Sequence, residues 1–300
     1  MEERYAPYLS FLGLPEELRP TSGPKVGILP VPYDLTTSYQ PGARRGPIAI
    51  LEASTHLETF DEELEWDPSA FLRLETLAPV VPDTSGPEAT MRRIYAVACE
   101  VLKTHDFLVG LGGEHSVSFP LVKAVRERHP HVGVLQLDAH ADLRESFEGS
   151  PYNHACVMHR ILELGLPTVQ VGIRSLTAEE HDLIKAGKVT TIFAPEAVQQ
   201  PVQEFLPRVL AALPEEVYVT VDLDAFDPAI MPATGTPEPG GLSWYRALEI
   251  LREVAKSRRI VGFDVVELAP LPSLVAPDFL AAKLVYKLLA YAFAPIHLRS

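Results

Sequence analysis

Three ionisable residues alternate with alanines in one short segment of the chain, Asp138-Ala139-His140-Ala141-Asp142. In an extended backbone, residues i, i+2 and i+4 point the same way, so the two carboxylates and the imidazole can converge. Three such groups on one side of the chain would repel one another or lose solvation without a cation between them. For this segment alone, a solvated turn is the alternative.

A second segment repeats this arrangement, because Asp222 and Asp224 also share a face, and His115 follows another apolar run. Two independent pairs of alternating carboxylates plus a histidine, all at the ends of apolar runs, argue against solvated turns. The candidate metal ligands are His115, Asp138, His140, Asp142, Asp222 and Asp224.

Six ligands are too many for one ion, so shared carboxylates would bridge two ions about 3.5–4 Å apart, the spacing of two-metal hydrolytic sites. An oxygen-rich set without thiolates favours Mn²⁺, with Mg²⁺ and Co²⁺ as alternatives. A structural zinc site would more often use cysteine and histidine sets. Water between two divalent ions is largely hydroxide at neutral pH, which gives a hydrolase its nucleophile. We therefore predict two Mn²⁺ per subunit.

Short apolar runs that alternate with helical patterns must position these residues. Most runs are continuous rather than alternating, which is typical of parallel strands buried on both faces. The predicted strands span residues 26–31, 107–111, 132–137, 168–171, 217–223 and 260–266, and the predicted helices span 47–59, 88–104, 117–128, 154–164, 177–186, 203–213, 243–257 and 278–293. This alternation predicts an α/β fold with a doubly wound, mostly parallel sheet. We expect an N-terminal arm over residues 1–24 and one catalytic domain over 25–300.

The polar clusters fall at the ends of four of these runs, where open α/β sheets bind their ligands. Residues 112–116 follow the run at 107–111, and residues 138–142 follow the run at 132–137. Likewise, residues 222–228 and 264–267 follow the runs that begin at 217 and 260. Four strands therefore deliver carboxylates and imidazoles to one edge of the sheet.

Composition limits the partners. The chain has 26 basic and 40 acidic residues, a formal net charge of −14, and 47% hydrophobic residues, which excludes intrinsic disorder. Such a charge disfavours nucleic acids and anionic membranes and tolerates cationic small molecules. The two cysteines form no CxxC pair, and neither a signal peptide nor a membrane-spanning stretch is recognisable, so we expect a cytoplasmic protein.

Four ordered motifs resemble those of the ureohydrolases, the arginase/agmatinase superfamily of binuclear manganese enzymes that release urea from guanidino compounds. They are Gly-Gly-Glu-His-Ser at 112–116, Asp-Ala-His-Ala-Asp at 138–142, Asp-Leu-Asp-Ala-Phe-Asp-Pro at 222–228 and Asp-Val-Val-Glu at 264–267. The resemblance covers residues 25–295 and implies the three-layer α/β/α, arginase-like fold. It also implies a homo-oligomer, commonly a trimer or a hexamer. Position 114 is Glu where many members have Asp, and position 155 is Ala where many have Gly.

The resemblance also implies roles for the site residues. One metal would be held by His115, Asp138, Asp142 and Asp222, and the other by His140, Asp138, Asp222 and Asp224. Asp142 would also accept a hydrogen bond from the bridging hydroxide. Glu267 matches the glutamate that pairs with the substrate guanidinium, and His154 matches the histidine that shuttles protons and helps to orient substrate.

The loop after Asp142 suggests the substrate. It lacks the Asn/Thr/Ser-rich stretch with which arginases bind the α-amino acid group, and it supplies Glu145 and Glu148 instead. Acidic groups tolerate a substrate that ends in an ammonium group. The sequence of the loop also resembles that of agmatinases. We therefore predict hydrolysis of agmatine to putrescine and urea, with Glu145 and Glu148 as further substrate-binding residues.

Other substrates and functions stay open. N1-aminopropylagmatine suits the same acidic loop, guanidinobutyrate or guanidinopropionate would need a cation such as Arg144 or Arg174, and arginine and formiminoglutamate are further alternatives. A related zinc deacetylase or metallophosphoesterase lacks support in the motifs, and a non-catalytic scaffold would typically have lost a ligand. The loop at 41–47 lacks the Gly-Lys-Ser/Thr ending of a nucleotide-binding loop.

Overall fold

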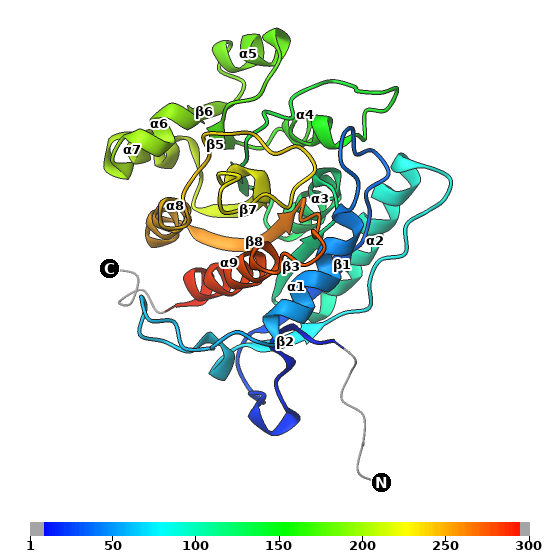
Figure 1. The fold of residues 1–300 in the computed structure, drawn as a ribbon, viewed down its shortest axis with the longest axis vertical. Helices are drawn as coiled ribbons and strands as arrows, with labels where there is room; N and C mark the ends of the chain where they lie inside the picture. The colour runs from blue at the N-terminus through cyan, green and yellow to red at the C-terminus, as the bar shows by residue number, and fades with distance from the viewer. Residues whose placement is uncertain (1–8, 295–300) are drawn as a thin grey trace.

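Eight strands form one sheet in the order β2-β1-β3-β8-β7-β4-β5-β6. The computed structural model describes residues 9–294, and within that range every neighbouring pair of strands is parallel (Figure 1). The strands are β1 (Lys25–Val31), β2 (Arg73–Thr76), β3 (Phe107–Gly112), β4 (Gly133–Leu137), β5 (Thr168–Ile173), β6 (Thr190–Phe193), β7 (Glu216–Asp222) and β8 (Arg259–Val266). The predicted doubly wound parallel sheet is confirmed.

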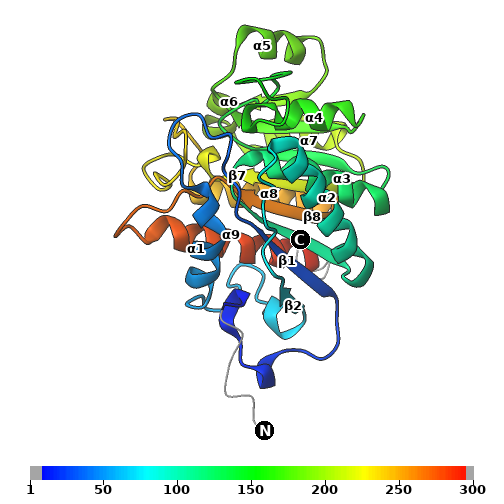
Figure 2. The same cartoon turned by 90° about the vertical axis from the view of Figure 1, so that its right-hand side faces the viewer.

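Helices cover both faces of this sheet (Figure 2). One layer holds α1 (Gly46–Ser54), α6 (Ala194–Gln199), α7 (Val202–Ala212), α8 (Trp244–Ser257) and α9 (Ala276–Phe293). The other layer holds α2 (Pro87–Thr104), α3 (Ser118–Arg128), α4 (Val157–Glu163) and α5 (Ala178–Lys185). The three-layer α/β/α arrangement is therefore present.

Burial on both faces explains why the strands are continuous apolar runs. Leu135 and Leu137 of β4 pack in the layer with α6 to α9, whereas Val134 packs in the layer with α2 to α4. All six predicted strands and all eight predicted helices are found, within three residues of their expected ends, except that the helix predicted over 47–59 ends at Ser54. The four-residue strands β2 and β6 and the six-residue helix α6 were not predicted.

The central strands bring the four polar motifs together. β3, β8, β7 and β4 are neighbours in the sheet, and Figure 1 shows the first three of them in its middle. Leu137 pairs with Val221, and Val221 pairs with Val265, so these strands end in nearly the same row. The segments that follow them therefore leave the sheet side by side at its carboxyl edge.

The predicted N-terminal arm is described only from residue 9 onwards, and residues 1–8 lie outside the described residues. Two 3₁₀ turns, Phe11–Gly13 and Glu16–Leu18, precede β1, and Phe11 and Leu12 are buried in the core beside α1. The last six residues of the predicted domain also lie outside the description. No helix in residues 9–294 is long and apolar enough to cross a membrane.

A buried ion cluster fastens the segment before β2 to helix α9. Lys287 is 1% exposed, and its Nζ lies 2.9 Å from Asp61 Oδ2 and 2.7 Å from Glu63 Oε2. Tyr291 also donates a hydrogen bond to Glu63. Burial raises the pKa of Glu63, but the bonds from Lys287 and Tyr291 outweigh that effect and lower it.

Replacing Lys287 with methionine is expected to lower the free energy of unfolding by about 3–5 kcal/mol, because the fully buried Asp61 would lose its counter-charge. Lys283→Met, one turn earlier on α9, is the matched control and should cost less than about 1 kcal/mol. Denaturant unfolding at pH 7 measures both. Because the folded-state pKa of Glu63 is lowered, its stabilisation is present above its unfolded pKa and is lost as the pH falls. The difference in the free energy of unfolding between wild type and Lys287→Met should therefore become smaller as the pH falls. Equal unfolding midpoints for the two lysine variants at pH 7 would contradict this account.

Candidate active site

The first group of candidate ligands surrounds one buried histidine nitrogen. His115 opens a 3₁₀ turn, His115–Val117, directly after β3, and it is fully buried. Its Nδ1 lies 2.9 Å from Asp138 Oδ2, 3.2 Å from Asp142 Oδ2 and 3.3 Å from Asp222 Oδ2. Residues that follow β3 and β4 and the last residue of β7 therefore converge on one point, as their positions at the sheet edge predict.

The second group lies beside the first and shares Asp138 with it. His140 Nδ1 is 2.9 Å from Asp224 Oδ2 and 3.6 Å from Asp138 Oδ1. Asp224 belongs to the 3₁₀ turn Leu223–Ala225 that follows β7. The ligating atoms of His115, Asp138 and Asp142, and those of Asp138, His140 and Asp224, form two sets in which all atoms lie within 4.8 Å of one another.

The chemistry of this donor set fits metal cations. His115 Nδ1 is buried and forms no hydrogen bond within the described part of the chain, although three carboxylate oxygens surround it. Burial and the negative charge of Asp138 raise the pKa of Asp142 to about 7. Burial and Asp224 likewise raise the pKa of Asp222 well above its ordinary value. A divalent cation would offset this crowding of carboxylates, which ligate hard cations well.

Hydrogen bonds between buried side chains hold the candidate metal ligands in place. His115 Nε2 lies 2.9 Å from Thr220 Oγ1, and Thr220 donates its hydroxyl to Asp264 Oδ1 at 2.6 Å. Ser118 and Tyr218 also donate to Asp264. Because Thr220 gives its proton to Asp264, it accepts from His115 Nε2, which leaves Nδ1 without a proton and able to bind a metal.

A second network of hydrogen bonds supports Asp138. Gln136 donates from Nε2 to Asp138 Oδ2 at 2.6 Å, and its own Oε1 accepts from Gln170. Gln136 and Thr220 were not singled out from the sequence. The sequence feature that could have identified them is a polar residue inside an otherwise apolar buried strand, in the runs Val-Leu-Gln-Leu and Val-Thr-Val-Asp.

Replacing Thr220 with valine keeps the shape of the side chain and removes the hydroxyl that orients His115. We expect the affinity for Mn²⁺ to fall by about 10–100-fold, the usual effect of losing a group that orients a ligand. Thr168→Val is the matched control, since Thr168 is also buried and, among residues 9–294, its hydroxyl bonds only to Leu166 O. Metal titration followed by calorimetry measures both variants. If Thr220→Val bound metal as tightly as Thr168→Val, the orienting role would be wrong.

Glu267 follows β8, and its carboxylate contacts the turn that holds His115. Its backbone conformation is strained. It is 5% exposed, and its φ of 66° lies in the left-handed region. Its carboxylate accepts a hydrogen bond from His115 N at 2.7 Å, and its own N–H donates to Gly113 O at 2.8 Å. Asp142 has a similar φ of 53°. Strained residues that the surroundings hold so firmly are typical of functional sites.

His154 lies across from Glu267, in the 3₁₀ turn His154–Cys156 before α4. Its Nδ1 is 3.9 Å from Glu267 Oε1, and its Nε2 is 3.1 Å from Ser38 Oγ. Burial, and then the charges of His140 and His115, lower the pKa of His154 to about 4. The ring is therefore neutral near pH 7 and can accept a proton.

A cavity of about 250 Å³ opens above these groups. Its lining includes His140, Asp142 and His154, together with Arg144 and Phe147 from the loop that follows Asp142. Glu145 and Glu148 are exposed and are not among the residues that line the cavity. The structure thus brings eight of the ten predicted site residues together and leaves these two outside, and their role stays a prediction.

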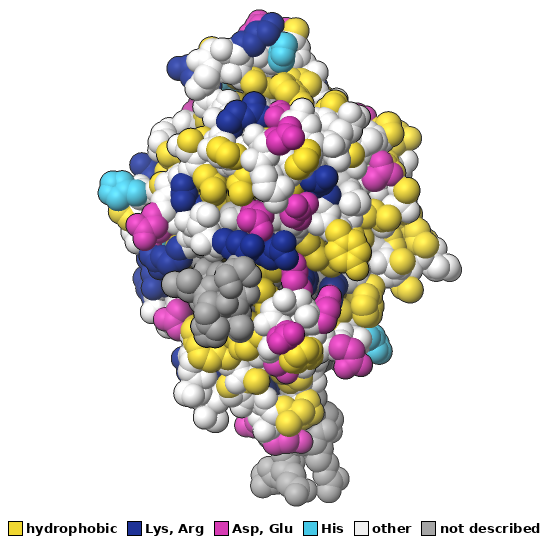
Figure 3. All heavy atoms as spheres, turned by 90° about the vertical axis from the view of Figure 1, so that its left-hand side faces the viewer, with side chains coloured by type: hydrophobic (Ala, Val, Ile, Leu, Met, Phe, Trp, Pro, Cys, Tyr) yellow, Lys and Arg dark blue, Asp and Glu magenta, His cyan; other side chains and the backbone are white. Residues whose placement is uncertain are grey.

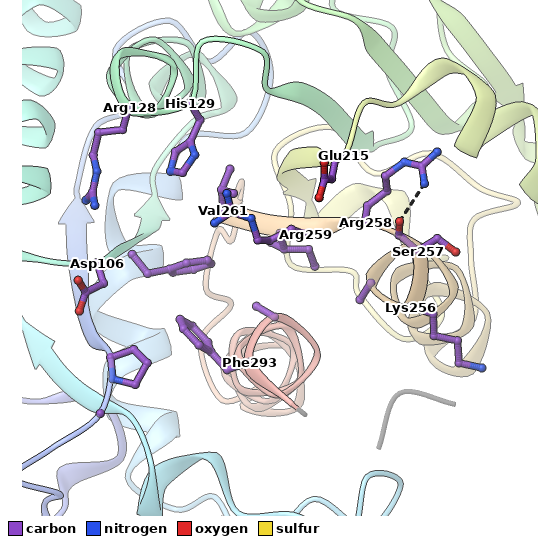
Figure 4. A pocket seen from close by; sticks show the side chains of 16 residues that line it. Asp106, Arg128, His129, Glu215, Lys256, Ser257, Arg258, Arg259, Val261 and Phe293 are labelled. Atoms are coloured by element: carbon purple, nitrogen blue, oxygen red, sulfur yellow. Dashed lines mark hydrogen bonds between the residues drawn. The ribbon is translucent and has the colours of Figure 1, made fainter. Parts of the chain in front are cut away.

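A larger cavity, of about 770 Å³, lies at the opposite, amino edge of the sheet (Figure 4). Arg128 and Arg258, which Figure 4 shows on opposite sides of it, donate to main-chain carbonyls at the ends of α2 and α7. Arg259 pairs with Glu216. These three arginines are therefore engaged in holding the fold.

Comparison with known proteins agrees with this geometry. Residues 24–290 match the model of the Arginase family. The N(1)-aminopropylagmatine ureohydrolase of a Synechocystis species is 40% identical over 272 residues, 89% of this chain and 88% of that protein. The agmatinase of Pyrococcus horikoshii is 37% identical, over 81% of this chain and 83% of that protein.

Solved structures show the same fold. The proclavaminate amidino hydrolase of Streptomyces clavuligerus superposes with a TM-score of 0.86 and 30% identity, covering 96% of this chain and 98% of that one. The fold, the order of the motifs and the sequence matches agree over nearly the whole chain. This chain is therefore a hydrolase that belongs to the Arginase family, as the resemblance of its motifs predicted.

Proposed function

We propose that this ureohydrolase cleaves the guanidino group of N1-aminopropylagmatine, with agmatine as the second candidate, and releases urea and an amine. The observation that carries the proposal is the convergence of two histidines and four aspartates beside the buried carboxylate of Glu267. The Glu267 carboxylate lies next to these candidate metal ligands, and a buried carboxylate can bind a planar guanidinium.

We propose two Mn²⁺ per subunit, held by His115, Asp138, His140, Asp142, Asp222 and Asp224. When bound, such ions supply hydroxide from water at neutral pH. Metal content after loading with Mn²⁺ tests the stoichiometry.

Residues of the chain itself would bind the substrate and move its protons. Glu267 would pair with the guanidinium and direct its carbon toward the attacking oxygen. Attack forms a carbon–oxygen bond, and the bond from that carbon to the substituted nitrogen then breaks to give urea and the amine. His154, neutral at rest, would take up a proton and pass it to the leaving nitrogen.

The relatives support the choice of substrate. The Synechocystis relative is named for N1-aminopropylagmatine, and the less similar Pyrococcus relative is named as an agmatinase. The two substrates share the guanidinobutyl part that the buried site would hold and differ at the far end, toward the mouth of the cavity. Agmatine, predicted from the sequence, is therefore the second candidate.

One observation favours a guanidino acid as a further candidate. Arg144 lines the cavity and stacks on Phe147, with Cζ 4.3 Å from the ring centre, and its guanidinium forms no ion pair within residues 9–294. Arg174, the other cation considered, donates to five main-chain carbonyls and is not available. Only Arg144 of these two is placed to meet a distal carboxylate.

Urea release by the Mn²⁺-loaded protein discriminates these substrates. We expect kcat/KM to be highest for N1-aminopropylagmatine, lower for agmatine, and at least about 100-fold lower for guanidinobutyrate, arginine and formiminoglutamate, a difference of about 2.7 kcal/mol. Arg144→Gln sharpens the test, since it should raise activity on the cationic substrates and lower it on guanidinobutyrate. Preferred turnover of guanidinobutyrate by the wild type, lost in Arg144→Gln, would overturn the polyamine assignment.

We also propose that the chain forms a homo-oligomer, a trimer or a hexamer, in the cytoplasm. Hydrophobic side chains gather along the right-hand margin of the face in Figure 3. Leu271, Leu274, Val275 and Phe279, around the start of α9, are exposed apolar residues of the kind that subunit contacts cover. Light scattering during size-exclusion chromatography tests the assembly.

A further inference from the structure

The loop between β1 and α1, residues 32–45, is anchored by two buried carboxylates and reaches the proposed active site. Asp34, 4% exposed, accepts hydrogen bonds from Gly42 N at 3.0 Å and Arg44 N at 3.3 Å. Glu114, fully buried, accepts from Thr36 N at 2.6 Å and from Thr36 Oγ1 at 2.5 Å. The loop is therefore fixed from within and from the turn that precedes His115.

This loop contacts His154 twice. Thr36 Oγ1 accepts a hydrogen bond from His154 N at 3.0 Å, while Ser38 Oγ lies 3.1 Å from His154 Nε2. Thr36 thus supports the main chain of the histidine, and Ser38 contacts its ring. Two residues of one anchored loop define where the imidazole lies.

The two ring nitrogens of His154 face opposite surroundings. Nδ1 is directed toward Glu267, 3.9 Å away, and Nε2 toward Ser38. The side chain of His154 is 14% exposed, whereas Ser38 is exposed and lines the cavity. The Ser38 hydroxyl is therefore the more exposed partner of this contact and links Nε2 to the cavity.

Nothing else in the described residues uses this hydroxyl. Its contact with His154 is its one hydrogen bond within residues 9–294. The neighbouring Thr37 shows the contrast, because its Oγ1 donates to Asp34 O and closes a local turn. The hydroxyl at position 38 is thus directed at the histidine rather than at the loop.

We propose that Ser38 is the positioning residue of His154: its hydroxyl fixes the ring and its tautomer and passes protons between Nε2 and solvent. The inference rests on the proposed ureohydrolase function. In that reaction one proton leaves when water becomes the attacking hydroxide, and one returns when the amine product becomes an ammonium ion. As Nδ1 gives its proton to the leaving nitrogen, Nε2 takes the hydroxyl proton of Ser38, which takes one from water. When the next attacking water is deprotonated, Nδ1 takes up its proton, Nε2 returns a proton to Ser38, and Ser38 returns one to solvent.

Three variants test the proposal: Ser38→Ala, Ser38→Thr, and Thr37→Ala as the matched control. In Ser38→Ala we expect kcat to fall by about 10–100-fold with KM and metal content near those of wild type, since proton transfer by a positioned group is worth at least that much. Ser38→Thr should restore most of kcat, and Thr37→Ala should resemble the wild type.

The second readout is independent of turnover. In metal-free protein labelled with ¹⁵N-histidine, the nitrogen shifts of His154, assigned by comparison with His154→Gln, should change in Ser38→Ala and stay unchanged in Thr37→Ala. A wild-type kcat in Ser38→Ala, or a reduced kcat with unchanged His154 shifts, would overturn the proposal. If the wild type turned over no guanidino substrate, the proposed function would fail, and the nitrogen shifts alone would decide whether Ser38 fixes the tautomer.

Discussion

Replacing Asp138 with alanine is expected to prevent binding of the two proposed Mn²⁺ ions and to abolish measurable urea release. Asp138 belongs to both sets of converging ligand atoms, with Oδ2 2.9 Å from His115 Nδ1 and Oδ1 3.6 Å from His140 Nδ1. A carboxylate shared between two ions cannot be replaced by water without losing charge at both positions. Metal analysis after loading with Mn²⁺ and a urea assay on the same sample measure the effect.

The thermal stability of this variant provides a second measure. Metal that binds only the folded state stabilises it by RT ln(1 + [L]/Kd), so wild-type Tm should rise with added Mn²⁺ and fall with a chelator. The Tm of Asp138→Ala should respond to neither. Asp182→Ala, which removes an exposed carboxylate on α5, should behave as the wild type does. A variant at 138 that kept two ions and full activity would show that the site assignment is wrong.

The convergence of the proposed metal ligands was predictable because these residues are local in the sequence. Alternation places Asp138, His140 and Asp142 on one face of a short segment, and parallel strands end at one edge. The sheet order, which the spacing of the runs does not encode, then decides that β3, β8, β7 and β4 are the neighbours. The motifs indicated that the proposed ligands would lie close together. The crossover connections of the fold determine which strands bring them together.

The parts that were not predicted depend on context. Strand β2 carries Arg73 and Glu75 at an edge of the sheet and buries none of its residues fully, so it lacks the apolar run of a central strand. Ser38 meets His154 across 116 positions of sequence, which no periodicity reveals. Glu145 and Glu148 illustrate the converse, because their proximity to Asp142 in sequence does not bring them into the lining of the cavity.

Replacing Glu267 with glutamine is expected to lower turnover of the guanidino substrate strongly while leaving the proposed Mn²⁺ ions bound. Glutamine keeps the length of the side chain and the oxygen that accepts from His115 N at 2.7 Å, so the turn before α3 should stay in place. It removes the negative charge that we propose pairs with the substrate guanidinium. Loss of a buried, bidentate charged pair costs about 3–5 kcal/mol, which lowers kcat/KM by about 10²–10³-fold or more.

The comparison that decides this prediction uses two readouts and one control. Metal content and the Mn²⁺ dependence of Tm should match the wild type in Glu267→Gln, whereas both are lost in Asp138→Ala. Glu179→Gln, an exposed position on α5, should retain full turnover. Glu267 is no metal ligand in our assignment, so metal loss in Glu267→Gln would reassign it to the metal centre. Undiminished urea release would instead mean that another group binds the guanidinium. Glu267 has a strained φ of 66°, and its hydrogen bonds with His115 and Gly113 help to hold it in place; glutamine can form both. A loss of activity with intact metal and stability would therefore report the missing charge alone.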